Sequence, residues 1–364
     1  MSAETIPHPP TRQPKRRKTT GLSCLVFALA AVAGLNLCLT LGFIGYYLNY
    51  RNTALAANET PAAPLEVLQT VVPILPAPTA AATPTAVPTP APIPATGIVN
   101  ILLLGKDERP DEIGRPTRTD TMMILRADFD QHTAKLLALP RDMWVALPGL
   151  DAYGITEGRI NTAYYYGEVY DVPGGGAKLA MDAVTLNFGV PLDHYALVNF
   201  NGFVQIVDAL GGIDIDVPER IYDDQFPTDD YGTMTLIIEP GFQHMDGTLT
   251  LRYARTRHQD GDTERVKRQQ LVLLAIRDKA LTFDALIKIP EVYAAVQGSY
   301  ETDMSLPDLI SYGVSGQQID RAAIATYVID QDMLAAWETP SGAHVWIPQR
   351  ARIGPVIEAF MAVP

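Results

Sequence analysis

Apolar runs and alternating apolar and polar positions follow one another from about residue 97 to the end of the chain. Residues 98–105 (IVNILLLG) form a continuous apolar run, which is typical of a strand buried on both faces. Residues 119–130 and 133–145 predict two strands joined by a tight polar turn. Residues 195–200 (YALVNF) predict another buried strand, and residues 213–217 (IDIDV) alternate as expected of a strand.

Helical signals lie between and after these strands. Residues 175–189 predict a helix that ends at its final glycine, and residues 199–212 predict a second helix with Asn201 as its N-cap. Residues 263–281 predict a long helix. Strands and helices in this order predict one α/β domain over residues 97–364, a three-layer α/β/α arrangement with a central mixed β-sheet.

The N-terminal part has a different pattern. Residues 21–48 contain no charged residue, and about 20 apolar residues are enough to cross a bilayer. A cleaved signal peptide is the alternative, but this run is longer and ends in an aromatic group. Residues 1–20 carry five basic residues, whereas only Arg51 comes just after the run. The positive-inside bias therefore predicts a single-pass cell-membrane protein with a cytoplasmic N-terminus and an extracytoplasmic domain.

Residues 49–96 are predicted to form an extracytoplasmic linker. From Pro61 to Thr96 the chain is rich in Pro, Ala and Thr, and Glu66 is its only charged residue. Ten prolines in this stretch exclude regular structure. At ~3.1 Å per residue along a polyproline-like path, the linker spans on the order of 100 Å, enough to reach into a cell-wall layer.

Charge and cysteine content argue against disulfide bonds in the outer part and against a nucleic-acid partner. Cys24 and Cys38 both fall in the predicted membrane span, so the outer part forms no disulfide and folds on its core alone. The chain has a net charge of -13, and residues 49–364, without the basic head and Glu4, carry -17. Such a surface repels polyanions, so we predict no nucleic-acid partner. Any phosphate that the domain binds must be held by a local cluster of positive charge.

Several catalytic motifs are absent from the sequence. It contains no GxxxxGK[ST] phosphate loop, no GxSxG nucleophile elbow and no HExxH zinc motif, and its six histidines are scattered. Thiol catalysis is excluded because both cysteines lie in the predicted span. The remaining candidates are Arg and Asp residues at the ends of predicted elements.

Two carboxylates flank the first two predicted strands. Asp107 follows residues 98–105, while Arg118 and Asp120 lie at the start of the next strand. If these strands are neighbours, both carboxylates meet at one edge of the sheet. Two carboxylates beside a phosphate suit Mg²⁺, which keeps waters and takes phosphate oxygens as ligands. Turn chemistry is the alternative, because Asp is common at strand ends.

Further charged pairs follow the third strand. Arg141 lies next to Asp142, and Arg159 lies two residues before Asn161. From spacing alone, a surface ion pair is the favoured explanation for each of them.

Residues 252–270 gather six Lys/Arg residues in nineteen positions of an otherwise acidic chain. Arg255 and Arg257 share a face if their segment is extended. The first turns of the following predicted helix carry three more polar residues on one face, namely Arg265, Arg268 and Gln269.

Basic residues in a first turn oppose the helix dipole. Asp262 or Thr263 is a natural N-cap for this helix, whose N-terminus favours negative charge. The arrangement is explained if an anion binds there, held by backbone N–H groups and Arg forks. The alternative is a solvated basic face whose like charges are relieved by Asp260, Asp262 and Glu264.

Together these motifs resemble the LytR-CpsA-Psr family of cell-envelope proteins. The resemblance covers roughly residues 97–364 and rests on an ordered set: NILLLGKDER, RTDTMMIL, LPRD, GRIN, FVQIVDALGGIDIDV, PGFQHMDG and RYARTRHQDGDTERVKRQQ. It implies an Mg²⁺-assisted enzyme that moves a glycopolymer from a polyprenyl-pyrophosphate lipid onto peptidoglycan through a phosphodiester. A hydrolase of the same lipid-linked glycan, and a non-catalytic module that binds polyprenyl phosphates, remain alternatives.

The resemblance also implies roles for single residues. Asp107 and Asp120 match the metal-binding aspartates and, with Arg118 and Arg141, make up the implied catalytic set. The implied pyrophosphate binders are Arg118, Arg141, Arg255, Arg257, Arg265 and Gln269, with Arg159, Asp262 and Arg268 as weaker matches. A lipid tail needs an apolar groove, for which the candidates are Phe200, Phe203, Val204, Val207 and Leu210; any one of them is also explained as core.

Residues 246–257 (DGTLTLRYARTR) give two conflicting signals. Thr248 and Thr250 alternate with leucines, which favours a strand by propensity. The family resemblance implies a helix at this position, and we expect the helix.

Overall fold

The computed structural model describes residues 94–108, 112, 114–228, 230–257, 261–281 and 300–363. All of them belong to one unit, Val87–Pro364. Within these residues, no helix combines the length and the apolar character that a membrane crossing needs. The predicted cytoplasmic tail, the predicted membrane span and the predicted linker up to residue 93 lie outside the described residues and stay predictions.

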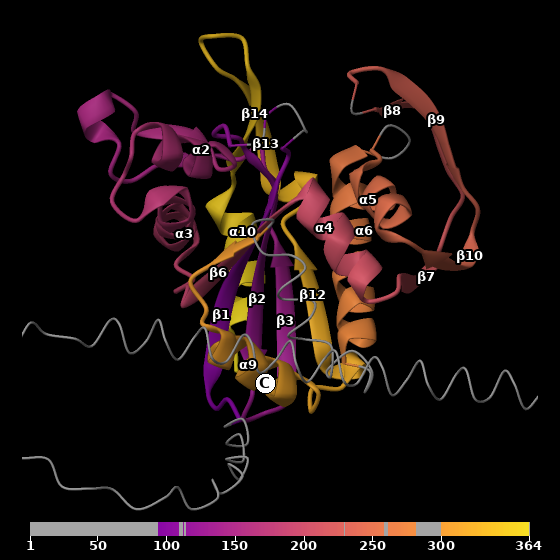
Figure 1. The fold of residues 1–364 in the computed structure, drawn as a ribbon. Coiled ribbons are helices and arrows are strands. Elements are labelled where there is room, and N and C mark those ends of the chain that lie inside the picture. The colour runs from indigo at the N-terminus through magenta and orange to yellow at the C-terminus, as the bar shows by residue number, and fades with distance from the viewer. Residues whose placement is uncertain are drawn as a thin grey trace, which may run out of the picture. The chain divides into compact units, whose positions relative to one another are not determined.

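Strands and helices alternate along the chain as the sequence predicts (Figure 1). The strands are β1 (Ile98–Lys106), β2 (Thr119–Asp128), β3 (Thr133–Ala138), β4 (Trp144–Ala146), β5 (Glu157–Arg159), β6 (His194–Asn199), β7 (Ile213–Val217), β8 (Ile221–Pro227), β9 (Thr233–Ile238), β10 (Gly241–Met245), β11 (Tyr300–Thr302), β12 (Ile324–Val328), β13 (Leu334–Glu338) and β14 (His344–Pro348). The described α-helices are α2 (Thr162–Val169), α3 (Gly175–Phe188), α4 (Phe200–Ala209), α5 (Gly247–Arg255), α6 (Gly261–Ala280), α9 (Leu306–Gly316) and α10 (Arg350–Met361). The described residues also form three short 3₁₀ turns, η1 (Asp151–Tyr153), η2 (Arg321–Ala323) and η3 (Gln331–Met333).

A six-stranded mixed sheet forms the centre, in the order β11-β6-β1-β2-β3-β12. β1, β2 and β3 are consecutive antiparallel neighbours, whereas β6 and β12 join β1 and β3 in parallel. The predicted mixed sheet is therefore confirmed. The tight turn predicted after β2 is also present, because Asp128 pairs with Thr133 across it.

The period-2 alternation of the central strands divides the core between the two faces of the sheet. Leu102, Ile124 and Leu137 pack with α3 and α10 on one face. Leu103, Met123 and Leu136, each one residue away, pack with α6 on the other face. Figure 1 shows α2 and α3 on one side of the sheet and α4, α5 and α6 on the other. Helices cover both faces, as the three-layer prediction requires.

The antiparallel pair β7–β10 and the hairpin β8–β9, which lies between these two strands in the chain, have a core of their own with α4, α5 and α6. Ile213, Ile215 and Val217 alternate into this core, while Asp214 and Asp216 are exposed, which confirms the strand predicted from IDIDV. This packing covers one side of α4 and leaves its other side to face the central sheet.

Three local predictions need correction. Asn199, not Asn201, caps α4, because its side-chain oxygen accepts from Gly202 N at 2.8 Å. α6 begins at Gly261, so Asp262 and Thr263 lie inside its first turn instead of at the cap. In β6, only Leu197 is fully buried, because the strand borders a cavity.

The conflict over residues 246–257 is resolved in favour of the helix. Asp246 caps α5, and its side chain accepts from Leu249 N at 2.7 Å. Thr250 is fully buried, and its hydroxyl donates to Asp246 O at 2.7 Å. This local hydrogen bond accommodates a residue that otherwise favours strands.

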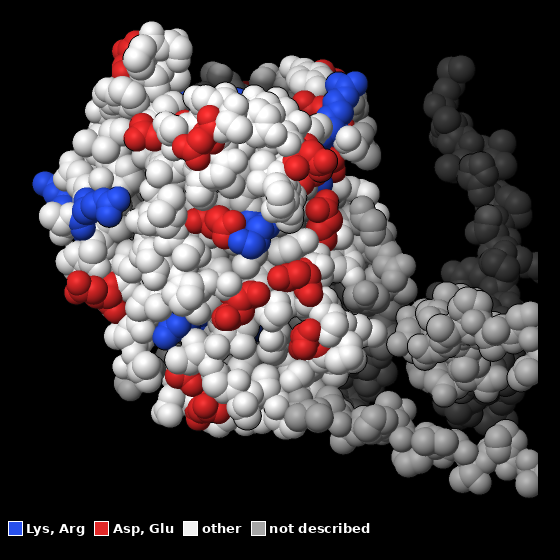
Figure 2. Space-filling model, turned by 90° about the vertical axis from the view of Figure 1, so that its left-hand side faces the viewer, with Lys and Arg blue, Asp and Glu red and all other residues white. Residues whose placement is uncertain are grey.

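Acidic residues dominate the exposed charge of the described domain. On the face that Figure 2 presents, Asp and Glu side chains are spread over the surface, with fewer Lys and Arg side chains among them.

Gly167→Ala is expected to destabilise the domain by about 1–3 kcal/mol, the usual cost of overpacking. A Cβ at position 167 of α2 would lie 2.5 Å from Gly176 Cα of α3, so the two helices would have to separate. Urea denaturation measures the change. Gly316→Ala is the matched control, because its Cβ meets nothing within 4 Å, and we expect it to be neutral or slightly stabilising. Equal stability of the two variants would contradict the close contact.

Candidate functional site

The antiparallel pairing of β1 and β2 brings the predicted acidic residues to one edge of the sheet. Lys106 pairs with Thr119, and Asp107 N donates to Arg118 O at 3.3 Å. Asp120 follows as the second residue of β2. Asp107 is half-buried, with Oδ1 fully enclosed, whereas Arg118 is exposed. The condition set by the sequence, that these two strands be neighbours, is met.

Arg141 is the centre of an ion-pair network beside Asp120. Its Nη1 pairs with Asp120 Oδ2, and its Nε lies 3.4 Å from Asp142 Oδ2 and 4.0 Å from Asp262 Oδ1. Asn161 donates from Nδ2 to the other oxygen of Asp120 at 2.9 Å. The predicted residues Asp120, Arg141 and Asp262 therefore form one cluster.

Backbone pairing holds this cluster in place. Asn161 O accepts from Thr119 N at the start of β2, and Asn161 N donates to Arg141 O, both at 3.3 Å. Arg159, the last residue of β5, places its Nε 3.1 Å from Asp142 Oδ1 and donates to His344 O at 3.0 Å. Arg159 thus ties the cluster to β14 and does not contact Asp120.

The first turns of α6 add another arginine, Arg265, beside Asp120 and Asp262. Arg265 is only 5% exposed; its Nη2 pairs with Asp262 at 2.7 Å, and its Nη1 donates to Asp120 O at 3.4 Å. Arg265 Nε is buried without a hydrogen-bond partner among the described residues. A buried guanidinium with an unused donor is well suited to an anion.

Electrostatics in the cluster favour an added anion. Burial lowers the pKa of Arg265, and the neighbouring Arg141 and Arg257 lower this pKa further, against the opposing effect of Asp262. Burial alone also lowers the pKa of Arg141, but Asp120 and two other carboxylates outweigh burial and raise this pKa. Both groups stay protonated at physiological pH. Positive charge is therefore less well compensated around Arg265 than around Arg141.

Arg268 and Gln269 fasten α6 to the end of α5. Arg268 is buried and donates to Thr256 O, and Gln269 donates to Ala254 O at 3.2 Å. These bonds fix the segment that carries Arg255 and Arg257.

Arg255 and Arg257 do not share a face as the alternation suggested. Arg255 is the last residue of α5, and Thr256 turns the chain into an extended conformation. The Arg255 guanidinium lies 4.2 Å from the centre of the Phe200 ring, at a large apolar cavity. Arg257 lines a second, smaller cavity together with Arg141. The two arginines thus reach two different cavities.

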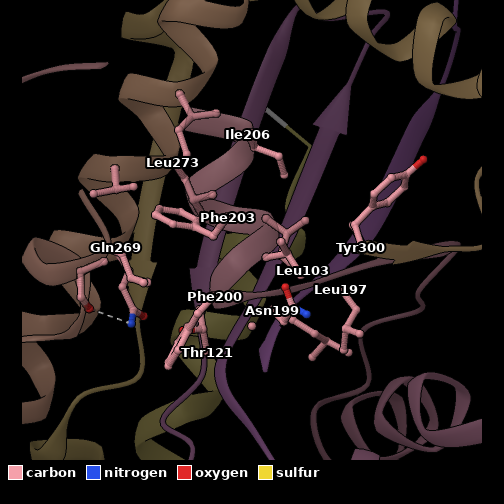
Figure 3. Close-up of a pocket in the computed structure, with 18 of the residues that line it drawn as sticks. Leu103, Thr121, Leu197, Asn199, Phe200, Phe203, Ile206, Gln269, Leu273 and Tyr300 are labelled. Carbon is pink, nitrogen blue, oxygen red and sulfur yellow. Dashed lines mark hydrogen bonds between the residues drawn. The ribbon is translucent and has the colours of Figure 1, made fainter. Parts of the chain in front are cut away.

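The apolar cavity has a volume of about 480 Å³ and lies between the central sheet and α4, α5 and α6. Figure 3 shows Phe203 and Ile206 of α4 and Leu273 of α6 around it, with Leu103 of β1 opposite. Its polar residues include Thr121, Asn199, Arg255 and Gln269. The cavity is therefore amphiphilic. Its large apolar volume lies beside Arg141 and Arg265, which together with their partners Asp120 and Asp262 are called the arginine cluster.

Three of the five residues predicted for an apolar groove line this cavity: Phe200, Phe203 and Leu210. Val204 and Val207 do not line it, and Val207 is fully buried in the core of the β7–β10 region. The prediction was wrong for these two residues because α4 has apolar contacts on two sides. One side faces the cavity, and the other packs into the core formed with β7–β10.

Comparison with known proteins gives the family. The sequence profile of the LytR_cpsA_psr family matches residues 77–359. The chain belongs to the LytR_cpsA_psr family. Relatives include the regulatory protein MsrR of Staphylococcus aureus strain Mu50, 30% identical over 231 residues that cover 61% of this chain and 62% of MsrR.

Another LytR_cpsA_psr relative is TagU of Oceanobacillus iheyensis, a polyisoprenyl-teichoic acid–peptidoglycan teichoic acid transferase. TagU is 33% identical over 213 residues, which cover 58% of this chain and 60% of TagU. The chain thus spans less than two thirds of the length of these two relatives. Among solved structures, B. subtilis TagV has a TM-score of 0.59 and 25% identity, covering 74% of this chain and 100% of TagV. TagT bound to LI-WTA has a TM-score of 0.56 and 24% identity, covers 72% of this chain and 89% of TagT, and shows the fold alone.

One buried acidic residue in this LytR_cpsA_psr site was missed by the sequence analysis. Glu108 is 7% exposed and accepts from Asn199 Nδ2 at 2.7 Å, next to Lys106 at 3.9 Å. Asn199 also caps α4, so it connects the end of β1 with the helix that borders the apolar cavity. In the sequence, the one indication of a role for Glu108 was its position directly after Asp107, at the end of the strand.

Proposed function

We propose that this chain is a membrane-anchored phosphotransferase that moves a glycopolymer from a polyprenyl-pyrophosphate lipid onto peptidoglycan through a phosphodiester bond. The observation that carries the proposal is the apolar cavity of about 480 Å³ beside a cluster of buried and half-buried arginines. A long apolar tail attached to a pyrophosphate has the same two halves. The name of the relative TagU, which states transfer of teichoic acid to peptidoglycan, supports the same reaction.

The proposed reaction balances as a phosphoryl transfer. The oxygen of an acceptor hydroxyl bonds to the phosphorus that carries the glycan, and the bond from that phosphorus to the bridging oxygen breaks. Polyprenyl monophosphate leaves, and the hydroxyl proton passes to a carboxylate of the site. Such reactions depend on alignment and charge neutralisation, which forked guanidinium groups supply. Arg141 and Arg265 are held for this role by Asp120 and Asp262.

The donor set at the sheet edge fits Mg²⁺. Asp107 and Asp120 supply carboxylate oxygens, and Mg²⁺ is commonly held by one or two carboxylates together with substrate phosphates and water. Among the described residues, no group of three His, Cys, Asp or Glu side chains is placed to hold a metal. Bound pyrophosphate oxygens would therefore complete the ligands. When bound, the ion would neutralise developing charge on the phosphate oxygens.

Residues 21–48 would hold the enzyme at the membrane, where its lipid donor resides. The linker that follows would let the domain reach both the lipid and the wall. Both parts of the proposal rest on the charge pattern and composition of the N-terminal region.

The proposed function is tested by following the glycan. Purified residues 97–364 are incubated with a glycan-labelled lipid donor, Mg²⁺ and peptidoglycan fragments, and the products are separated. Label on the fragments is the expected result. Free phosphorylated glycan in the presence of fragments would favour a hydrolase, and label remaining on the lipid would favour a non-catalytic module; either outcome contradicts the transferase.

Ala196→Phe is expected to weaken binding of a short-chain polyprenyl phosphate by at least about 10-fold, the effect of losing a substantial apolar contact area. Ala196 lines the apolar cavity, so the added ring occupies space proposed for the lipid tail. Inorganic pyrophosphate should bind as in the wild type, because it needs only the arginine cluster. Ala325→Phe, on the exposed part of β12, is the matched control. Unchanged lipid affinity in Ala196→Phe would show that the tail binds elsewhere.

A further inference from the structure

A second cavity, of about 180 Å³, borders the arginine cluster. It lies between the ends of β3 and β12, the first turn of α6, and β14. Apolar side chains make up part of its lining, and its polar and aromatic lining residues are Arg141, Asp142, Arg257, Asp262, Thr263, Gln331 and Trp346. None of the residues that line the apolar cavity also lines this one.

The two cavities border successive turns of one helix. On α6, Asp262, Thr263 and Val266 line the second cavity, whereas Gln269, one turn further, lines the apolar cavity. Arg265 lies between these positions, with its guanidinium paired to Asp262 and bonded to Asp120 O. The arginine cluster therefore lies between a large apolar cavity and a smaller one whose lining is both polar and apolar.

One aromatic residue, Trp346 of β14, lines the second cavity, and the other two tryptophans do not line it. All three tryptophans of the chain lie on β4, β13 and β14. The rings of Trp144 and Trp337 pack edge to face with centroids 5.7 Å apart. The main-chain N–H of Trp346 donates to the main-chain carbonyl of Asp142 at 3.1 Å, which places the backbone of β14 beside the ion-pair network. The cavity thus combines the indole ring of Trp346 and several aliphatic side chains with carboxylate and amide groups.

This combination is the chemistry that recognises a sugar ring. The C–H face of a pyranose packs on an aromatic face, while carboxylate and amide oxygens accept from its hydroxyls; a large rigid aromatic ring offers such a surface at low entropic cost. A cavity of roughly 150 Å³ accommodates a benzene ring. The second cavity, at about 180 Å³, is somewhat larger, and because it is open to the surface a sugar ring can enter it in part.

We propose that the second cavity is the acceptor subsite, where one sugar ring of the acceptor glycan stacks on Trp346 and presents its hydroxyl to the arginine cluster. This inference rests on the proposed transferase function. In-line displacement places the attacking and leaving oxygens on opposite sides of the phosphorus. With the lipid tail in the apolar cavity, the leaving lipid phosphate lies on that side of the cluster, so the acceptor approaches from the side of the second cavity.

The test compares Trp346→Leu with Trp346→Phe, two variants that both remove the indole but differ in keeping an aromatic face. Transfer is measured at varied concentrations of a soluble peptidoglycan tetrasaccharide and, separately, of the lipid donor. Trp346→Leu is expected to raise the acceptor KM about 10-fold, the scale of a lost aromatic contact, while Trp346→Phe stays within about 3-fold of the wild type. The donor KM is expected to change little in either variant.

A binding measurement separates this inference from the proposed function. Calorimetric titration with the tetrasaccharide alone requires no turnover, and we expect Trp346→Leu to weaken this binding about 10-fold as well. If the wild type transfers no glycan but this difference in binding persists, the transferase proposal fails and the sugar subsite stands. If the wild type transfers glycan and Trp346→Leu has a normal acceptor KM, the subsite alone fails.

Two further results would also overturn the acceptor subsite. Equal losses in the Leu and Phe variants, with an unchanged tetrasaccharide affinity, would mean that Trp346 acts only through packing. A raised donor KM with a normal acceptor KM would assign the cavity to the donor glycan instead.

Gln331→Ala keeps the test valid if Trp346→Leu does not fold, because Gln331 is exposed and lines the same cavity. We expect Gln331→Ala to raise the acceptor KM about 3-fold, as for one lost hydrogen bond.

Discussion

Asp120→Asn is expected to lower the rate of glycopolymer transfer by about 10³-fold, the upper range for losing one preorganised electrostatic group. The carboxylate of Asp120 holds Arg141 by an ion pair, accepts from Asn161 and is proposed to bind Mg²⁺. Asparagine has nearly the same size but no charge, so it weakens all of the electrostatic functions at once. The rate is measured with saturating donor and Mg²⁺.

The fold of Asp120→Asn is expected to survive. Arg141 keeps Asp142 and Asp262 as partners, so its charge is not left uncompensated. Asp130→Asn, in the exposed turn between β2 and β3, is the matched control and should transfer at the wild-type rate. A loss of activity that parallels a loss of thermal stability would mean that Asp120 serves the fold and not the reaction.

Arg257→Lys is expected to reduce turnover by about 10²-fold, on the scale of one lost donor to developing charge. Arg257 lines the second cavity beside Arg141 and lies close enough to Arg265 to lower the pKa of Arg265. Lysine keeps the positive charge but not the planar fork that binds two phosphate oxygens. Lipid affinity should fall less than turnover, because the developing charge is greatest in the transition state.

Arg350→Lys provides the control for this substitution, since Arg350 is exposed at the start of α10. Both variants should have the melting temperature of the wild type. Near-normal turnover of Arg257→Lys would show that charge alone is required at this position, and the pyrophosphate-clamp interpretation of Arg257 would be abandoned.

The central sheet could be predicted because the apolar residues of its strands show in the sequence which strands are buried. Residues 98–105 are apolar at nearly every position, and the structure buries this strand between α3 and α10 on one face and α6 on the other. The helix over residues 175–189 was equally clear, because Gly189 ends it in the left-handed conformation that glycine favours. The apolar run of the strand and the glycine that ends the helix are local features of the sequence. Both predictions therefore did not depend on contacts with the rest of the fold.

The exact lining of the apolar cavity could not be predicted, because an apolar residue that faces a cavity looks the same in sequence as one that faces a core. Phe203 and Val207 lie on the same helix, yet Phe203 lines the apolar cavity and Val207 is buried in the β7–β10 core. The place of Trp346 beside Asp142 depends on a contact between residues about 200 positions apart, which no local pattern reports. Local spacing gave the candidate arginines, but tertiary packing decides which cavity each arginine reaches.

The separation of Arg255 from Arg257 has the same origin. Their alternation implies a shared face only in an extended segment, and α5 continues through Arg255 before the chain extends at Thr256. Arg268 and Gln269 fix this change of direction through bonds to the backbone of Thr256 and Ala254. The prediction failed at a helix end, where one residue changes the direction of the next side chain.

The central claim, that the arginine cluster carries out phosphoryl transfer, is tested most directly by following both phosphorus atoms of the donor. A lipid donor is prepared with one phosphorus isotope on the lipid side and another on the glycan side, and it is incubated with the enzyme, Mg²⁺ and peptidoglycan fragments. The account predicts glycan-side phosphorus in a phosphodiester on the fragments and an equal amount of lipid-side phosphorus in polyprenyl monophosphate. Recovery of both isotopes on the lipid, with the glycan alone on the fragments, would contradict it.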